Sequence, residues 1–366
     1  MVLICGEEAL ELLLHGEQRF RRLFKARAHM QSDVARSARS IKDFLRETCQ
    51  IARDLELLSF PREALAALAD FSSRLAGHQK RLSLEYPAVR DLLVEADALA
   101  RAEGLDTVPA RIIARAQELR DFRDNLIEEE FLEDYDKEII KVPTTGSAVG
   151  RVNGLTVTGF GDYVFGLPHQ IACTVGVGEG GIIDLEREAE LGGPIHTKAM
   201  LILKSYLLGR FATDKPIVLA GSLYFEQSYA NVEGDSASGA ELAALLSALS
   251  QVPVDLSLAF TGAVNQSGAI MAVGSVTNKI EGFFSVCRRR GLTGSQGVLI
   301  PSDNVDDLML KPEVVQAVRD KTFHIHPVRT IEEAMTRLTG RSTRSLMHRV
   351  DTRLAALAET ARAYRN

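Results

Sequence analysis

The chain has 366 residues, 46% of them hydrophobic, which is enough for two or three domains with a substantial core. Its net charge of −6 at pH 7 disfavours a general nucleic-acid binder, because such proteins are usually basic. No apolar run reaches the ~18 residues that a membrane helix needs, and the N-terminus carries no signal-peptide pattern, so we expect neither a membrane nor nucleic acid among its partners.

Residues 1–30 predict a strand, a helix and a second strand. Two strands are too few to form a stable sheet alone, so this segment either completes a sheet with sequence elsewhere or packs on the unit that follows. We interpret residues 1–30 as the remnant of a larger α/β subdomain.

Residues 31–140 predict an α-helical domain in which proline and glycine are confined to the ends of the helices. Pro61, Pro87 and Pro109 each stand where an apolar-periodic run begins, and Gly104 closes the second run. Proline is favoured in the first turn of a helix and glycine just after the last. The segment carries no pattern typical of a catalytic site.

Residues 141–341 predict an α+β domain. Glycine becomes frequent after Thr144, and the apolar residues become β-branched or aromatic, which favours short strands and turns. Helices are expected at 194–211 and 275–290, and strands at 217–225, 297–300 and 322–328, with a hairpin turn at 265–268. Residues 342–366 predict an Arg-rich, amphipathic C-terminal helical extension, either a solvated face or an interface.

The four cysteines, Cys5, Cys49, Cys173 and Cys287, lie far apart and form no CxxC pair. Reduced thiols in a cytoplasmic protein fit this spacing better than a disulfide framework or a zinc site. The sequence therefore predicts a cytoplasmic protein with no metal site and no cofactor.

The segment EGDSASGAELAALLSALS places Ser236 and Ser238 at the start of an apolar-periodic helix. Free backbone N–H groups and the helix dipole favour negative charge there, which suits a serine alkoxide or a tetrahedral oxyanion. Serine and aspartate are also common helix-capping residues, so the local pattern by itself favours an ordinary helix cap.

A serine nucleophile needs a base that removes its proton. His169 and His196 stand in no recognisable triad context, and a lone histidine is more often a packed or surface residue. Lys279 directly precedes an apolar ridge that includes Ile280 and Phe283. Burial under that ridge would lower the pKa of the lysine, and only its neutral amine accepts a proton. An exposed lysine at the start of a helix is the competing interpretation.

Two motifs and their spacing carry a family resemblance. EGDSAS occupies residues 233–238, and Lys279 of GSVTNKIEGFF follows Ser236 by 43 residues, with FTGAVNQSGAIMAVGS between them. Together they resemble the proteolytic domain of Lon proteases, from about Val149 to Gly340. The resemblance implies that Ser236 is the nucleophile and Lys279 the general base.

The same resemblance implies supporting roles for nearby residues. Thr261, in the FTG turn, matches a threonine that hydrogen-bonds the lysine, and Glu233 matches an acidic residue near the dyad. Backbone N–H groups around Asp235 and Ser236 would form the oxyanion hole. Many bacterial relatives carry Asp-Gly-Pro-Ser-Ala-Gly at this turn, so the chain resembles the EGDSAS branch instead.

The first part of the chain resembles pieces of an AAA+ ATPase, with residues 23–28 similar to the last strand of its large subdomain and residues 31–140 similar to its helical lid. No GxxxxGK(S/T) phosphate loop occurs, and no apolar run ends in the paired acidic residues that hold Mg²⁺. We therefore expect no ATP hydrolysis by this chain in that family's manner. The resemblance also implies a homohexameric ring whose chamber admits only extended chains.

The leading hypothesis is a serine endopeptidase with a Ser–Lys dyad that degrades unfolded polypeptides and peptides without ATP. One alternative is that the chain is the protease part of a longer, ATP-dependent Lon-like protease. Another is a non-catalytic assembly or adaptor protein that reuses the fold, although a scaffold has no need of Ser236 or Lys279.

Overall fold

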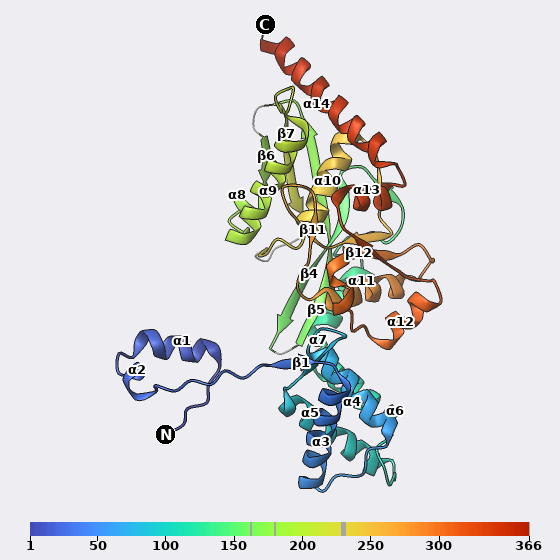
Figure 1. Ribbon diagram of the computed structural model, residues 1–366. Coiled ribbons are helices and arrows are strands. Elements are labelled where there is room, and N and C mark those ends of the chain that lie inside the picture. Colours follow the sequence, from blue (N-terminus) through green and yellow to red (C-terminus); the bar gives the residue numbers. More distant parts are fainter. Residues whose placement is uncertain (162, 179–180, 228–231, 366) are drawn as a thin grey trace.

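The computed structural model describes residues 1–161, 163–178, 181–227 and 232–365 (Figure 1). A group of helices from the first part of the chain lies at one end of the molecule, and a mixed sheet with helices around it lies at the other. The predicted fold class, a helical region followed by a mixed α/β region, is confirmed. None of the described helices has both the length and the hydropathy that crossing a bilayer requires.

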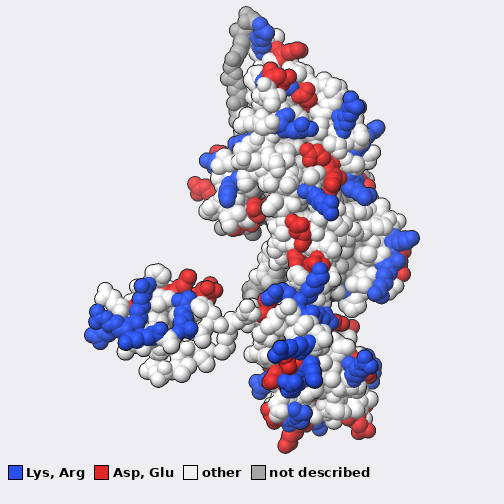
Figure 2. Space-filling view, in the orientation of Figure 1, with Lys and Arg blue, Asp and Glu red and all other residues white. Residues whose placement is uncertain are grey.

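The N-terminal arm contains α1 (Glu7–Gly16) and α2 (Phe20–Leu23) and lies off to one side of the helical region (Figure 1). Lys and Arg side chains gather on this arm in the space-filling view (Figure 2). The strands that we expected on either side of α1 are absent, since residues 1–6 and 24–31 adopt no regular structure. A strand needs a hydrogen-bonding neighbour, and the described residues provide none here.

The helical region has a core of its own. A capping box at Ser37 and Ser40 starts the first of its long helices. The run that begins at Pro109 forms two helices, which meet at Asn125. The elements are β1 (Asp33–Ala35), α3 (Ala38–Asp54), α4 (Arg62–Leu75), β2 (Arg81–Ser83), α5 (Tyr86–Ala102), α6 (Ala110–Asp124) and α7 (Leu126–Asp136). The buried apolar residues of α3 to α6 form one cluster, whereas α7 packs with β5 and α11 of the second region.

The second region is built on a seven-stranded sheet with the strand order β13-β12-β9-β4-β5-β7-β6. The three neighbouring pairs between β13 and β4 are parallel, as is β6 with β7, while β5 runs antiparallel to both of its neighbours. The strands are β4 (Arg151–Phe160), β5 (Tyr163–Gly176), β6 (Gly181–Asp184), β7 (Ala220–Phe225), β9 (Leu258–Phe260), β12 (Gly297–Pro301) and β13 (His324–Val328).

Alternate residues of the central strands enter two different cores. On β9, Leu258 and Phe260 join one apolar cluster and Ala259 joins the other, because successive side chains of a strand point to opposite faces. The first cluster contains the fully buried helix α10 (Ser238–Ser250), and the second contains α11 (Val276–Arg290). The sheet is therefore covered by α10 on one face and by α11 on the other.

Further helices and several short elements complete the second region. Both α9 (Pro194–Phe211) and α14 (Thr343–Arg365) pack on α10, and the apolar side of α14 enters its core through Leu346 and Leu354. The C-terminal extension is thus a helix with one buried face. The remaining elements are β3 (Ser147–Ala148), α8 (Leu185–Glu188), β8 (Val254–Asp255), the expected hairpin β10 (Ala263–Val264) and β11 (Ile270–Met271), η1 (Ser302–Asp307), α12 (Pro312–Arg319) and α13 (Ile331–Thr339).

Candidate active site

Ser236 lies in a tight turn at the entrance to α10. Gly234 has φ of +101°, a backbone conformation that favours glycine, and it bends the chain just before the serine. The helix begins at Ser238 with Ala237 as its N-cap, and no side chain caps it. The expectation of a side-chain cap is therefore wrong, and the hydroxyl of the half-buried Ser236 is left for another partner.

That partner is Lys279, which is only 2% exposed in α11. Its Nζ donates a hydrogen bond of 2.8 Å to Ser236 Oγ. Burial lowers the pKa of the lysine from 10.5 to about 8, although the nearby carboxylate of Asp235 acts in the opposite direction. The structure therefore brings together a serine hydroxyl and an amine that loses its proton close to neutral pH.

Close backbone contacts hold the serine turn against the end of β9. The Gly262 N–H donates to the Ser236 carbonyl at 2.8 Å, and the Gly239 N–H donates to the Gly262 carbonyl at 2.9 Å. A Cβ added at Gly239 would lie 2.8 Å from that carbonyl oxygen and equally close to the ring of Phe260. Glycine at position 239 thus allows α10 to approach the strand closely enough to fix the serine turn.

A second close approach positions the helix of the lysine. A Cβ added at Gly282 would lie 2.1 Å from the carbonyl oxygen of Gly166 on β5. The side chain of Asn278 also donates to the Val164 carbonyl at 2.7 Å. These contacts press α11 onto β5 at the level of Lys279.

Ser238, the rival nucleophile, is committed to a structural contact. Its Oγ accepts a hydrogen bond of 2.9 Å from the Val264 N–H, and the residue is 1% exposed. It joins the start of α10 to the hairpin that follows β9. The geometry favours Ser236 over Ser238 because the hydroxyl of Ser236 is the one in contact with the lysine amine.

Thr261 is fully buried beside the serine, but its hydrogen bonds differ from those we expected. Its Oγ1 donates to the Ser236 carbonyl at 3.2 Å, and its N–H donates to the Leu299 carbonyl at 3.1 Å. The expected bond between the threonine and the lysine amine is not among the contacts of the described residues. The threonine therefore holds the backbone of the serine turn.

Glu233 ties the serine turn to the first turn of α9. Its Oε1 accepts from the Ile195 N–H at 3.1 Å, and the neighbouring Val232 exchanges backbone hydrogen bonds with Leu191 and Gly193. The carboxylate that acts on the pKa of Lys279 is that of Asp235. Among the hydrogen bonds of the described residues, none has the backbone N–H of Asp235 or Ser236 as its donor.

The two candidate histidines lie away from the Ser236–Lys279 contact. His169 is half-buried, and the loss of water around its ring lowers its pKa to about 4. His196 is buried between carboxylates, with Nε2 3.4 Å from Asp184 and Nδ1 3.7 Å from Glu241. Burial acts to lower the pKa of His196, but these carboxylates outweigh it and raise the pKa. Neither histidine contacts the serine.

Glu241 is a buried acid that the sequence interpretation did not identify. It is 0% exposed, and both of its carboxyl oxygens lack a hydrogen-bond partner among the described residues. Burial raises its pKa to about 7, and the adjacent Asp184 and Glu186 add to the effect while His196 opposes it. A single acidic residue within an otherwise apolar helix was the signal in the sequence.

We expect Glu241→Gln to flatten the dependence of stability on pH. The folded pKa lies above the unfolded value of 4.5, so the folded protein binds the extra proton, and the stabilisation present below pH 4.5 is lost as the pH rises through 7. Glutamine cannot ionise and avoids this loss. Thermal unfolding between pH 5 and 8 measures the effect, with the exposed Glu188→Gln as control. Parallel curves for Glu241→Gln and the wild type would contradict it.

No group of three or more His, Cys, Asp or Glu side chains among the described residues is arranged to hold a metal ion. All four cysteines are free thiols, and Cys173 and Cys287 are buried.

Two family models match the chain. Residues 59–123 match the archaeal LonB AAA+ ATPase lid domain, and residues 227–340 match the Lon protease (S16) C-terminal proteolytic domain. The second match contains both Ser236 and Lys279. The first match covers the helices α4 to α6.

Curated relatives show the same likeness over more of the chain. A Lon protease homolog of Escherichia coli (strain K12) is 36% identical over 329 residues, which is 88% of this chain and 56% of that protein. A Lon protease homolog of Haemophilus influenzae is 39% identical over 255 residues, 69% of this chain and 42% of that protein. The archaeal Lon protease of Archaeoglobus fulgidus is 29% identical over 290 residues, 78% of this chain and 43% of that protein. The chain thus spans about half the length of these relatives.

Proposed function

Because this chain belongs to the Lon protease family, with a LonB-type lid followed by an S16 proteolytic domain, we propose that it is a serine endopeptidase whose catalytic dyad is Ser236 and Lys279. The observation that carries the proposal is the 2.8 Å hydrogen bond between Lys279 Nζ and Ser236 Oγ. Three neighbours support the dyad. Thr261 and Glu233 hold the serine turn, and the carboxylate of Asp235 favours the charged form of Lys279.

The depressed pKa makes the lysine suitable as a base. With a pKa of about 8, roughly one amine in ten is neutral at pH 7, compared with about one in three thousand for an ordinary lysine. The neutral amine takes the proton of Ser236 as Oγ attacks the scissile carbonyl carbon. The ammonium then gives this proton to the leaving amine, and the acyl group stays on the serine.

The second half of the reaction uses the same groups. The neutral amine of Lys279 takes a proton from a water molecule, whose oxygen attacks the ester carbon, and the proton returns to Ser236 Oγ as the new carboxyl group leaves. In both halves the negative charge on the tetrahedral oxygen develops near the N–H groups of Asp235 and Ser236. These donors belong to the turn that Gly262 and Thr261 hold in place.

We propose unfolded polypeptides and peptides as substrates, with no requirement for ATP in bond cleavage. Every group in the proposed mechanism is a side chain or backbone amide of this chain, and the mechanism consumes no nucleotide. Purified protein should therefore hydrolyse unfolded casein at the same rate with and without ATP and Mg²⁺, while stable folded domains survive. Stimulation of more than a few-fold by ATP would favour the alternative of an ATP-dependent protease. Absence of cleavage in both conditions would favour a non-catalytic adaptor.

We also propose that the protein forms a homohexameric ring. Exposed apolar side chains on α9 support assembly, since Ile195, Leu201 and Leu208 are 50%, 53% and 57% exposed and offer a surface that a second subunit could cover. Light scattering coupled to size-exclusion chromatography should give the mass of six chains. A fully active monomer at the assay concentration would contradict the ring.

A further inference from the structure

The helices α3 to α6 and the catalytic region keep separate apolar cores, and α7 is the helix that packs on the catalytic region. The cluster formed by α3 to α6 contains no described residue of α11, and the cluster around α11 contains none of α3 to α6. A groove of about 1280 Å³ runs between the two regions, lined by residues of both. Apart from the apolar cluster that α7 shares with β5 and α11, the contacts across this groove are made by polar and charged side chains, which define a specific orientation.

The principal contact of this kind joins Arg74, in the last turn of α4, to Glu281 of α11. Two parallel hydrogen bonds of 2.8 Å connect Nη1 to Oε1 and Nη2 to Oε2. Nη1 also donates to the Met309 carbonyl. The Glu281 side chain is only 10% exposed, so this is a two-pronged, largely desolvated pair, the geometry in which arginine and carboxylate bind most strongly.

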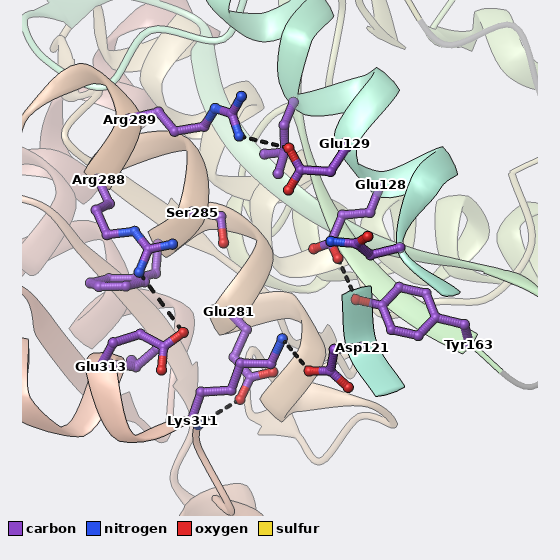
Figure 3. Close-up of a pocket in the computed structure, with 14 residues that line it drawn as sticks. Asp121, Glu128, Glu129, Tyr163, Glu281, Ser285, Arg288, Arg289, Lys311 and Glu313 are labelled. Carbon is purple, nitrogen blue, oxygen red and sulfur yellow. Dashed lines mark hydrogen bonds and ion pairs between the residues drawn. The ribbon is translucent and has the colours of Figure 1, made fainter. Parts of the chain in front are cut away.

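Other groups converge on the same carboxylate. Glu281 Oε1 accepts a hydrogen bond of 2.7 Å from the Lys311 N–H, and the Lys311 ammonium lies 3.1 Å from Asp121 of α6. Figure 3 shows Glu281, Lys311 and Asp121 pointing toward one another beside a small cavity of about 140 Å³. The helices α4 and α6 thus hold α11 through Arg74 directly and through Asp121 by way of Lys311. At the other end of α11, Arg289 pairs with Glu129 and Asp136 of α7.

Glu281 follows Lys279 by two positions on the same helix. Successive residues of an α-helix are turned by about 100°, so these two side chains leave α11 in nearly opposite directions. Lys279 points to Ser236 and Glu281 points to Arg74. A shift of the helical region would therefore be transmitted through Arg74 to the helix that carries the proposed base.

We propose that Arg74 and Glu281 are positioning residues for Lys279, so that the placement of the helical region sets the geometry and the burial of the base. The proposal rests on the function proposed above. Without the Arg74 contact, Glu281 keeps a buried charge with only the Lys311 N–H and the more distant ammonium beside it, and α11 moves to bring that charge to water. Lys279 is then less buried and less well aligned, because both properties depend on the position of the same helix.

The test measures phosphonylation of Ser236 by an alkyl fluorophosphonate as a function of pH, in the full chain; Oγ attacks phosphorus and fluoride leaves. Arg74→Met should lower the phosphonylation rate at pH 7.5 by about tenfold or more, since a misplacement near 1 Å has effects of this size. The midpoint of the alkaline rise should also move upward from about 8 toward the ordinary lysine value of 10.5. A residue that contributes only to stability would leave this midpoint unchanged.

Lys80→Met is the matched control. Lys80 also joins the helical region to the catalytic region, through Asp306, but its side chain is 69% exposed and its partner is not on α11. For Lys80→Met, the rate should stay within twofold of the wild-type rate, and the pH midpoint should equal the wild-type midpoint within experimental error. Arg74→Lys keeps the charge but loses the two-pronged bond, and it should shift the midpoint in the same direction by a smaller amount. It decides the question if Arg74→Met does not fold.

Two failures are distinguishable. If the wild-type protein is phosphonylated at Ser236 and both folded Arg74 variants match its rate and midpoint, the positioning proposal is wrong while the proposed function stands. If the wild-type protein is not phosphonylated at Ser236 at any pH, the proposed function is wrong and the positioning proposal falls with it.

Discussion

Ser236→Ala is expected to abolish peptide hydrolysis, with a loss on the order of 10⁵-fold or more, as for other serine hydrolases that lose their nucleophile. The physical reason is that Oγ forms the bond to the acyl group and no other hydroxyl contacts the Lys279 amine among the described residues. The fold should persist, because the half-buried side chain makes no other hydrogen bond there. Casein hydrolysis and thermal unfolding measure the two expectations together.

Ser238→Ala is the matched control for this experiment. It removes the acceptor of the Val264 N–H at a buried position, which should cost about 1–3 kcal/mol of stability. Hydrolysis per folded molecule should change far less than in Ser236→Ala. If instead Ser236→Ala remains active and Ser238→Ala is inactive, the nucleophile has been assigned to the wrong serine.

Lys279→Arg is expected to be inactive at every pH from 6 to 10. A guanidinium stays protonated in proteins, so the substitution keeps the positive charge and removes the base. In the wild type, the proton leaves as the pH rises through about 8, and activity should rise with the neutral amine over the same interval. Initial rates with an uncharged peptide substrate across this range measure both effects.

Asp235→Asn provides a second, smaller shift of the same titration. The carboxylate of Asp235 favours the ammonium form, so its removal should lower the pKa of Lys279 and move the activity rise to lower pH. An active Lys279→Arg protein, or a pH profile with no rise near pH 8, would show that another group serves as the base.

Local patterns determined much of the candidate site. Ser236 was placed before an apolar-periodic helix and Lys279 before an apolar ridge because both features are matters of sequence spacing, and helices at 194–211 and 275–290 were predicted for the same reason. The elements at these positions are α9 and α11. The neighbours of Lys279 also indicated burial, since Phe283, four positions along the helix, shares its side, but an exposed lysine remained open until the structure showed it 2% exposed.

Contacts between distant segments were decided only by the tertiary structure. The two serines of the EGDSAS turn are equivalent in local pattern, yet one contacts Lys279 and the other contacts Val264, because the turn meets α11 on one side and the hairpin after β9 on the other. Thr261 bonds to the serine backbone, and residues 1–6 and 24–31 form no strand for want of a neighbouring strand.

The ion pair between Arg74 and Glu281 is another contact between distant segments that only the tertiary structure decided. The two residues are separated by 207 positions, and nothing in either local sequence distinguishes this arginine and this glutamate from the other charged residues of surface helices. Periodicity reports which side of one helix is buried. It carries no information about which charged residues of a second helix meet it, because that choice depends on how the two packed regions fit together.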